Sequence, residues 1–150
     1  MKKKWIAITA LILIAVMVLG ALAVSGIMDR RKTLGLTLSA KDATSTSVTL
    51  ECIRKIGFVA GSVKTGSAYT LEQETELGWQ KVPQLPDYKS NWSLEATEVA
   101  KGANQWQLNL AEIYGELPPG TYRICKSFFT DREGRGSGRA VTLYAEFVVE

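Results

Sequence analysis

The stretch at residues 116–125, ELPPGTYRIC, holds a proline pair, a glycine and a tyrosine in an order that indicates how the surrounding chain folds. The two prolines restrict the backbone ahead of a turn, and Gly120 permits a dihedral that other residues avoid. Such a stretch is typical of a corner where the chain crosses between two packed β-sheets and a tyrosine hydroxyl bonds back to the main chain. The residues expected to form this corner are Leu117, Pro119, Gly120 and Tyr122.

Apolar and polar residues alternate on both sides of this stretch, from Thr33 to the end of the chain. A period of two is the pattern of strands with one face in a core and the other in solvent. Turn-forming residues separate the alternating segments, and one helical turn is expected at residues 111–114. About seven or eight short strands predict an all-β fold, an antiparallel β-sandwich. The residues expected to face its core are Leu34, Leu36, Leu38, Val48, Leu50, Cys52, Tyr69, Leu71, Trp92, Leu94, Ala96, Trp106, Leu108, Leu110, Tyr122, Ile124, Val141, Leu143, Ala145, Phe147 and Val149.

Three segments extend the pattern of the corner: LGLTLSAKDATSTSVTLEC at residues 34–52, YGELPPGTYRI at 114–124 and YAEF at 144–147. Together they resemble a bacterial immunoglobulin-like domain family found in membrane-anchored or secreted proteins of gut Firmicutes. The resemblance covers residues 34–150. It implies an immunoglobulin-like sandwich of about seven strands that lies outside the cytoplasm. It implies no catalytic residues and no ligand, and a disulfide at Cys52 is not a hallmark of the family.

Residues 5–28 contain no charged side chain and lie between two clusters of basic residues. About 20 apolar residues cross the hydrocarbon core of a bilayer as a helix, so this segment is long enough to span it. We expect a cytoplasmic basic tail at 1–4, a transmembrane signal-anchor helix at 5–28 and a juxtamembrane linker at 29–33. The lipid bilayer is then the first partner, and the domain lies outside the cell membrane. Cleavage of the segment as a signal peptide after Ala23 is the alternative.

Charge and composition exclude several classes of function. Six of the 18 Lys and Arg residues precede residue 33, where Asp29 is the one acid, so the remainder carries a net charge of −2. Binding of nucleic acid needs a concentrated basic face, and we expect none. The chain has no histidine, which excludes Ser-His and Cys-His nucleophiles and histidine-containing zinc sites. We expect no enzymatic activity, no cofactor and no metal.

The loop TDREGRGSGR at residues 130–139 is the main candidate for a binding loop. It connects the last two strands, and its arginines suit carboxylate or phosphate groups. A flexible, solvated hairpin is the alternative. The arginines of this loop are Arg132, Arg135 and Arg139.

Three further features carry weaker signals. Trp79 is a candidate exposed aromatic for stacking on sugar or peptide, although packing across a hairpin is the more common use of such a ring. Residues 58–67 contain glycines but lack the phosphate-loop pattern, so we interpret them as a connection between sheets. Glu72, Glu74 and Glu76 are interpreted as a solvated strand face, because a metal site needs converging oxygen ligands.

The two cysteines are judged from the alternation of their strands. Cys52 shares the inward face of its strand, whereas Cys125 alternates with Tyr122 and Ile124 and faces outward. The two sulfurs then point to different sides, beyond the separation that a disulfide allows. We therefore expect free thiols, unless a one-residue bulge reverses the register near Cys125.

Three hypotheses for function follow. The first is a membrane-tethered, extracytoplasmic, non-catalytic module for binding, adhesion or envelope organisation, with an unknown protein or glycan ligand. The second is an extracytoplasmic sensor or accessory subunit of a membrane complex. The third, the weakest, is a glycan hydrolase that uses a carboxylate pair, because no spacing of acidic residues singles out such a pair.

Overall fold

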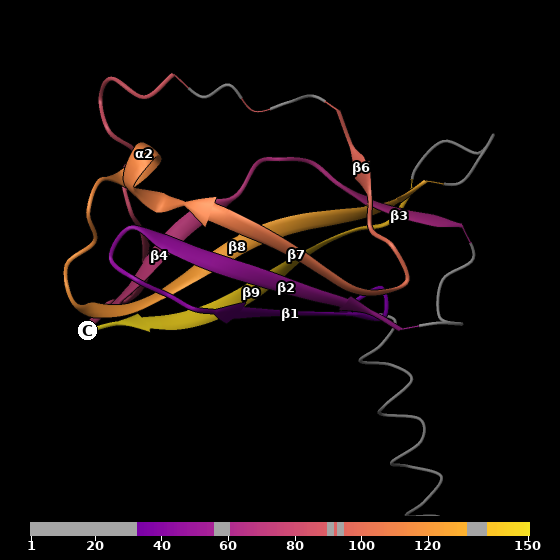
Figure 1. The fold of residues 1–150 in the computed structure, drawn as a ribbon, viewed down its shortest axis with the longest axis horizontal. Helices are drawn as coiled ribbons and strands as arrows, with labels where there is room; N and C mark the ends of the chain where they lie inside the picture. The colour runs from indigo at the N-terminus through magenta and orange to yellow at the C-terminus, as the bar shows by residue number, and fades with distance from the viewer. Residues whose placement is uncertain (1–32, 56–60, 90–91, 93–94, 132–137) are drawn as a thin grey trace, which may run out of the picture. The chain divides into compact units, whose positions relative to one another are not determined.

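The alternation of apolar and polar residues after residue 33 produces nine strands and one helical turn in the described residues (Figure 1). The structure is a computed structural model, and it describes residues 33–55, 61–89, 92, 95–131 and 138–150. The elements are β1 (Leu36–Lys41), β2 (Ser47–Arg54), β3 (Ser62–Thr65), β4 (Thr70–Thr75), β5 (Gly78–Lys81), β6 (Thr97–Glu98), β7 (Gly102–Asn109), α2 (Leu110–Tyr114), β8 (Gly120–Asp131) and β9 (Ala140–Val149).

The expectations for residues 1–4, 5–28 and 29–32 lie outside the described residues. Within the described part of the chain, no helix has the length and hydropathy needed to cross a membrane. Residues 33–150 form one compact unit.

Two antiparallel sheets face each other. The first has the order β1-β2-β7, and its register pairs Leu38 with Cys52 and Leu50 with Trp106, so that apolar residues of three strands share one face. The second has the order β5-β4-β8-β3-β6, and β9 pairs with the other edge of β8. Because both sheets turn an apolar face inward, the arrangement is an all-β sandwich, which confirms the predicted fold class.

The core is filled by two clusters of buried side chains, and Trp106 packs against both. The larger cluster lies beside α2 and consists of Val48, Leu50, Tyr69, Leu71, Leu110, Ile113, Tyr114, Leu117, Tyr122, Ile124, Ala145, Phe147 and Val149. The smaller cluster consists of Leu34, Leu36, Cys52, Val63, Val99 and Phe128.

The long strand β8 organises the second sheet. One of its edges pairs with β9 over ten residues, from Gly120 to Phe129. Its other edge is shared by two short strands, because β4 pairs with residues 122–125 and β3 pairs with residues 128–131. The segment between β3 and β4, residues 66–69, leaves the ladder and interrupts this edge of the sheet.

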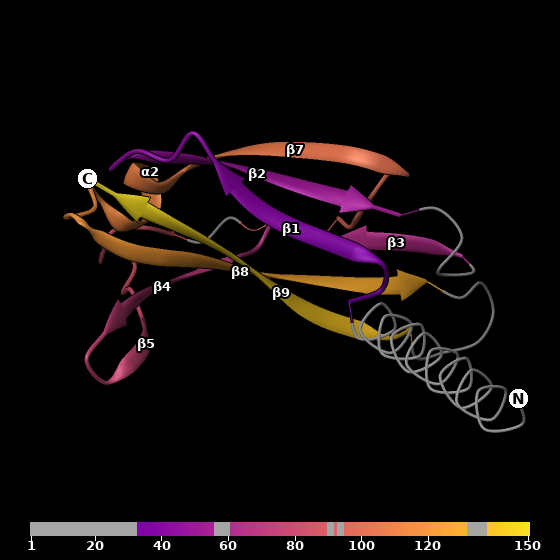
Figure 2. The same cartoon turned by 90° about the horizontal axis from the view of Figure 1, so that it is seen from below.

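The two long sides of the sandwich differ. On one side β1 and β9 contact each other and run in the same direction, which brings the two sheets together (Figure 2). On the other side lie the edge strand β7 and the interrupted edge formed by β3 and β4 (Figure 1). That second side contains the candidate site.

Several expectations for individual segments are wrong. Residues 62–65, interpreted as part of a connection, form β3 in the ladder beside β8. Trp92 and Ala96 are not in a strand, and Ala96 is exposed, because only Thr97 and Glu98 of that region pair with β3. Leu34 belongs to a turn with a φ of 56°, so β1 begins two residues later than expected, although Leu34 is still buried.

Candidate functional site

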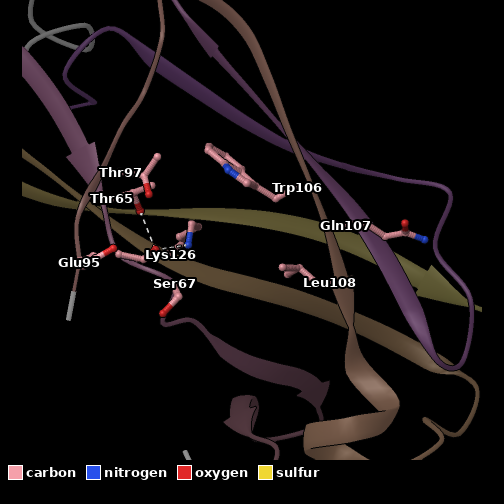
Figure 3. A pocket seen from close by; sticks show the side chains of 9 residues that line it. Thr65, Ser67, Glu95, Thr97, Trp106, Gln107, Leu108 and Lys126 are labelled. Carbon is pink, nitrogen blue, oxygen red and sulfur yellow. Dashed lines mark hydrogen bonds between the residues drawn. The ribbon is translucent and has the colours of Figure 1, made fainter. Parts of the chain in front are cut away.

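The interruption between β3 and β4 opens a pocket of about 310 Å³ on the side of the sandwich bordered by β7 (Figure 3). Cys125 is the last residue of β8 that pairs with β4, and Phe128 is the first that pairs with β3. Lys126 and Ser127 therefore lie opposite the gap. The pocket is lined by Thr65, Gly66, Ser67, Glu95, Thr97, Trp106, Gln107, Leu108 and Lys126.

Lys126 places a buried amine at this pocket. The alternation of β8 turns its side chain inward together with Ile124 and Phe128, and only 4% of the residue is exposed. Its Nζ donates a hydrogen bond of 2.8 Å to the carbonyl of Gly66, which closes part of the gap in the sheet edge. The Nζ atom also lies 5.7 Å from the centre of the Trp106 ring, whose electron-rich face attracts a cation.

No ion pair joins Lys126 to a carboxylate in the part of the chain that the structure describes. Burial lowers the pKa of Lys126 from its ordinary value to about 8, because removal of water disfavours the charged form. The titratable neighbour that acts in the other direction on this pKa is the Cys52 thiol, which is not a carboxylate. At neutral pH the amine of Lys126 is therefore mostly protonated, and Glu95 is the acidic residue among those that line the same pocket.

Polar groups around Lys126 fix its position. Thr65 donates through Oγ1 to the carbonyl of Ser127 at 2.8 Å, so a second side-chain bond spans the same gap. Trp106 forms the opposite wall and packs against Phe128 with ring centres 6.5 Å apart. Because the walls come from both sheets, the amine is held at a defined place between them, and the arrangement suits a carboxylate or another small anion.

A second cluster covers the outer face of the sheet that contains β8. Arg123 donates from Nε and Nη2 to Oε2 of Glu72, at 2.7 and 2.6 Å. Its guanidinium lies 4.3 Å from the ring centre of Trp79 and 4.4 Å from that of Tyr144, so it is stacked between two aromatic rings. The Arg123 guanidinium therefore has both a carboxylate partner and aromatic contacts within the fold.

The corner that contains Leu117 and Pro119 follows α2 along the chain and leads into β8, where Tyr122 lies. The Tyr122 hydroxyl donates to the carbonyl of Pro118 at 2.8 Å, and its ring is buried at 1% exposure. Leu117 is buried, and its amide donates to the carbonyl of Ser45 in the facing sheet. This chain crossing and the tyrosine bond are those found in immunoglobulin-like sandwiches.

Comparison with protein families decides the relationship. The family model for the bacterial Ig-like domain matches residues 32–148, most of the chain and nearly all of the sandwich. The chain belongs to the bacterial Ig-like domain family. Neither the search of curated proteins nor the search of solved structures found a match.

The glycine in the corner of this Ig-like domain has a different role from the one expected. Gly120 does not lie in the left-handed region of φ, although five other glycines of the described residues do. A β-carbon at Gly120 would lie 3.1 Å from Nε2 of Gln73 and 3.4 Å from the Tyr122 ring. Close packing therefore favours glycine at this position, because a β-carbon would make the Gln73 side chain shift by a few tenths of an ångström. Pro119 is exposed at the turn before it.

The other predicted site residues are dispersed over the Ig-like domain. Trp79 is half-buried and packs on Arg123, so its ring is occupied by an intramolecular contact. Arg139 is exposed, and its amide donates to Oγ1 of Thr130, at the base of the loop. Arg132 and Arg135 lie outside the described residues. The structure does not bring Trp79 or Arg139 to the pocket.

Both cysteines of the Ig-like domain are free thiols. Cys52 lies in the core, and burial raises its pKa to about 11. Cys125 faces the outer side of its sheet, yet only 9% of it is exposed, because neighbouring side chains cover it. Burial also raises the pKa of Cys125. Neither thiol has the lowered pKa of a reactive cysteine.

The acidic residues of β4 do not form a metal centre in the described residues, where no group of three potential ligands converges. Glu72 is bonded to Arg123, whereas Glu74 and Glu76 are exposed.

The sequence analysis did not identify Lys126 as a candidate site residue. The signal was available, because the alternation of β8 that places Tyr122 and Ile124 inward continues to Lys126, but a lysine is rarely expected in a core.

Proposed function

We propose that this Ig-like domain is a non-catalytic binding module, held on the outer face of the cell membrane by residues 5–28, and that the pocket at Lys126 is its binding site. The observation that carries the proposal is the buried ammonium group of Lys126, which faces a pocket and has no ion pair among the described residues. A buried charge without a partner is costly, so its retention is typical of a functional site.

The absence of histidine and the raised pKa values of both cysteines support a binding role over catalysis. General acid-base and nucleophilic chemistry need groups that titrate near neutral pH or are activated by a neighbour. Lys126 has a pKa of about 8, but its Nζ is bonded to the main-chain carbonyl of Gly66, which cannot take a proton from it.

The uncharged run at residues 5–28 supports the membrane location, because it is long enough for a spanning helix and is bounded by basic residues. Two reporter fusions at the C-terminus of the full chain test it in bacterial cells. Alkaline phosphatase is active outside the cytoplasm and should be active here, while a cytoplasmic fluorescent reporter should be dark. The reverse pattern would contradict the proposed orientation.

A released product lacking the N-terminal segment would show cleavage after Ala23 in place of anchoring. Mass spectrometry of the membrane and medium fractions distinguishes the two results.

The binding role is tested by proximity labelling of intact cells. The labelled neighbours should depend on the pocket, so that they are lost with Lys126→Met and kept with Arg123→Met. An identical set of neighbours for both variants would contradict the pocket as the binding site.

A further inference from the structure

The strand β7 is an edge strand without the features that usually protect such an edge. Its sequence, GANQWQLN, contains no charged residue and no proline. Natural edge strands are commonly guarded by lysines, prolines or bulges, because their unpaired amides and carbonyls can join a strand of another chain. An unguarded edge of eight residues is therefore a potential site for addition of a strand.

The hydrogen bonds of β7 leave one edge of the strand available. All eight residues pair with β2 on one side, from Gly102 opposite Arg54 to Asn109 opposite Ser47. At the start of β7, the Asn104 side chain bonds to the main chain of Ala100 and Gly102 and so covers the first turn of the edge. In the described residues, no further main-chain bond is made by residues 105–109 beyond those to β2.

This part of β7 borders the pocket that contains Lys126. Trp106, Gln107 and Leu108 form one wall, and Thr97 with residues 65–67 forms the other (Figure 3). A strand added to β7 would lie about 4.8 Å from it, along the mouth of this pocket. Every second side chain of that strand would point between the two sheets, toward the floor of the pocket. Lys126 lies on that floor.

We propose that an extended segment of a partner protein adds as a strand to residues 105–109 of β7 and places the carboxylate of one Asp or Glu side chain on the ammonium group of Lys126. The proposal rests on the proposed binding function and names the chemistry of its ligand. The main chain of β7 supplies hydrogen bonds that any sequence can use, and Lys126 supplies the selection for an acidic residue.

Charge complementarity supports an acidic segment as the occupant. Only 4% of Lys126 is exposed, and the acceptor of its hydrogen bond, the main-chain oxygen of Gly66, carries no negative charge of its own. A carboxylate that enters the pocket forms a charge-assisted hydrogen bond away from water, where such bonds are strong. It also relieves the cost of an isolated buried charge, so the pair is favoured over either group alone.

The pocket volume fits one side chain better than a folded ligand. About 310 Å³ accommodates an aspartate or glutamate side chain with its immediate neighbours, and the remaining residues of the segment would lie outside along β7. Glu95 also lines the pocket. Its carboxylate would repel any acidic side chain that does not lie directly on Nζ of Lys126, so we expect one acidic residue in each bound segment.

Selection from a library tests the proposal for a partner whose sequence is not specified in advance. The full chain in detergent micelles is panned against random displayed peptides of about seven residues, long enough to span the available part of β7. We expect the selected peptides to contain a single Asp or Glu at a fixed position among residues that favour strands. Failure to enrich any peptide, or enrichment without an acidic residue, would overturn the proposal.

The selected peptides are then measured by fluorescence anisotropy with matched variants. Lys126→Met should weaken binding by about tenfold or more, the loss expected for one charge-assisted bond. Changing the acidic residue of the peptide to its amide should weaken binding to the wild type equally and have no further effect on Lys126→Met. Arg123→Met, which removes a cation from the other face of β8, should bind within about twofold of the wild type. Equal binding by the wild type and Lys126→Met contradicts the inference.

Hydrogen exchange of the wild-type chain supplies a readout that does not depend on a variant. Bound peptide should slow amide exchange within residues 105–109, and a peptide N-methylated on alternate amides should bind only when the methyl groups face away from β7. Unchanged exchange in this segment would exclude strand addition. Self-association of the chain that competes with the peptide would identify a second copy as the occupant in place of a partner. These results are independent of membrane orientation, so failure of the reporter fusions and failure of this inference are distinguishable.

Discussion

Arg123 and Lys126 lie three residues apart on β8 and point to opposite faces of the same sheet. Arg123, on the outer face, has a carboxylate partner in Glu72 and aromatic rings on both sides. Lys126, on the inner face, has one main-chain oxygen and, among the described residues, no carboxylate in an ion pair. The cation closer to water is thus fully balanced, and the one removed from water is not.

This difference separates stability from function within one strand. Another buried cation, Arg54, donates to the carbonyls of Val99 and Gly61 and lies 3.6 Å from Glu98, so even this residue has a nearby acid. Lys126 departs from both arginines. Its charge lowers the stability of the free domain, and a ligand that supplies the missing charge recovers that loss.

Replacement of the inner cation should have the largest effect. Lys126→Met keeps the length of the side chain and removes the buried charge, so we expect the free energy of unfolding to rise by about 2 to 3 kcal/mol at pH 7. Urea unfolding of the full chain in detergent measures it. A loss of stability would instead show that the amine makes bonds that the free domain requires.

The free energies of unfolding of the wild type and of Lys126→Met should converge as the pH rises. The pKa of Lys126 is about 8 when folded and near 10.5 when unfolded, so the unfolded chain holds the proton over this interval. The destabilisation by Lys126 is complete below pH 8 and disappears as the pH approaches 10.5. The advantage of Lys126→Met should therefore fall by about 2 kcal/mol between about pH 7 and pH 9.5.

Other groups titrate in that pH range, but their contributions to the free energy of unfolding cancel when Lys126→Met is compared with the wild type. Cys52 has a pKa of about 11 in the folded state and stays protonated at about pH 9.5 in both proteins. Its effect on unfolding is common to them. A constant difference between the two unfolding curves from about pH 7 to pH 9.5 would show that the amine titrates normally and would contradict the burial of its charge.

Removal of the Arg123 cation should change the free energy of unfolding in the opposite direction. Arg123→Met breaks the ion pair with Glu72 and leaves that half-buried carboxylate without its donor, so we expect a loss of about 1 to 2 kcal/mol. Thermal unfolding in the same detergent compares it with Lys126→Met. A gain in stability for both variants would mean that the two faces do not differ in the way described.

Stacking of the Trp79 ring on Arg123 should make the smallest contribution to stability of the three. Trp79→Leu removes one ring from Arg123 but keeps an apolar side chain, and we expect a loss of about 0.5 to 1 kcal/mol. In a double-mutant cycle with Arg123→Met the two losses should be less than additive, since they remove the same contact. Fully additive losses would indicate that Trp79 stabilises the hairpin independently of Arg123.

The alternation in the sequence predicted the elements that carry long apolar faces. The inward residues of β2 and β9, from Val48 to Cys52 and from Ala145 to Val149, are buried as expected. The short strand β3 was harder to recognise. β3 has four residues, SVKT, in which the buried Thr65 and Val63 alternate with polar neighbours over too short a length to establish a period.

The candidate site depended on information that local patterns do not contain. Trp79 and Arg123 meet because β5, β4 and β8 are neighbours in the sheet, and the order of strands is not written in any one of them. The pocket exists because residues 66–69 leave an edge that β3 and β4 otherwise share. Lys126 itself followed the alternation of β8, and only its charge argued against an inward position.

Cys52 and Cys125, the only cysteines in the chain, remain unoxidised and shielded in the folded domain. The protein therefore reaches its final form without thiol oxidants or disulfide isomerases, on whichever side of a membrane it folds. Its two sheets are held by packing and by the Tyr122 corner. Because both cysteines are free thiols, a change in the redox poise of the surroundings should leave the amount of folded protein unaltered.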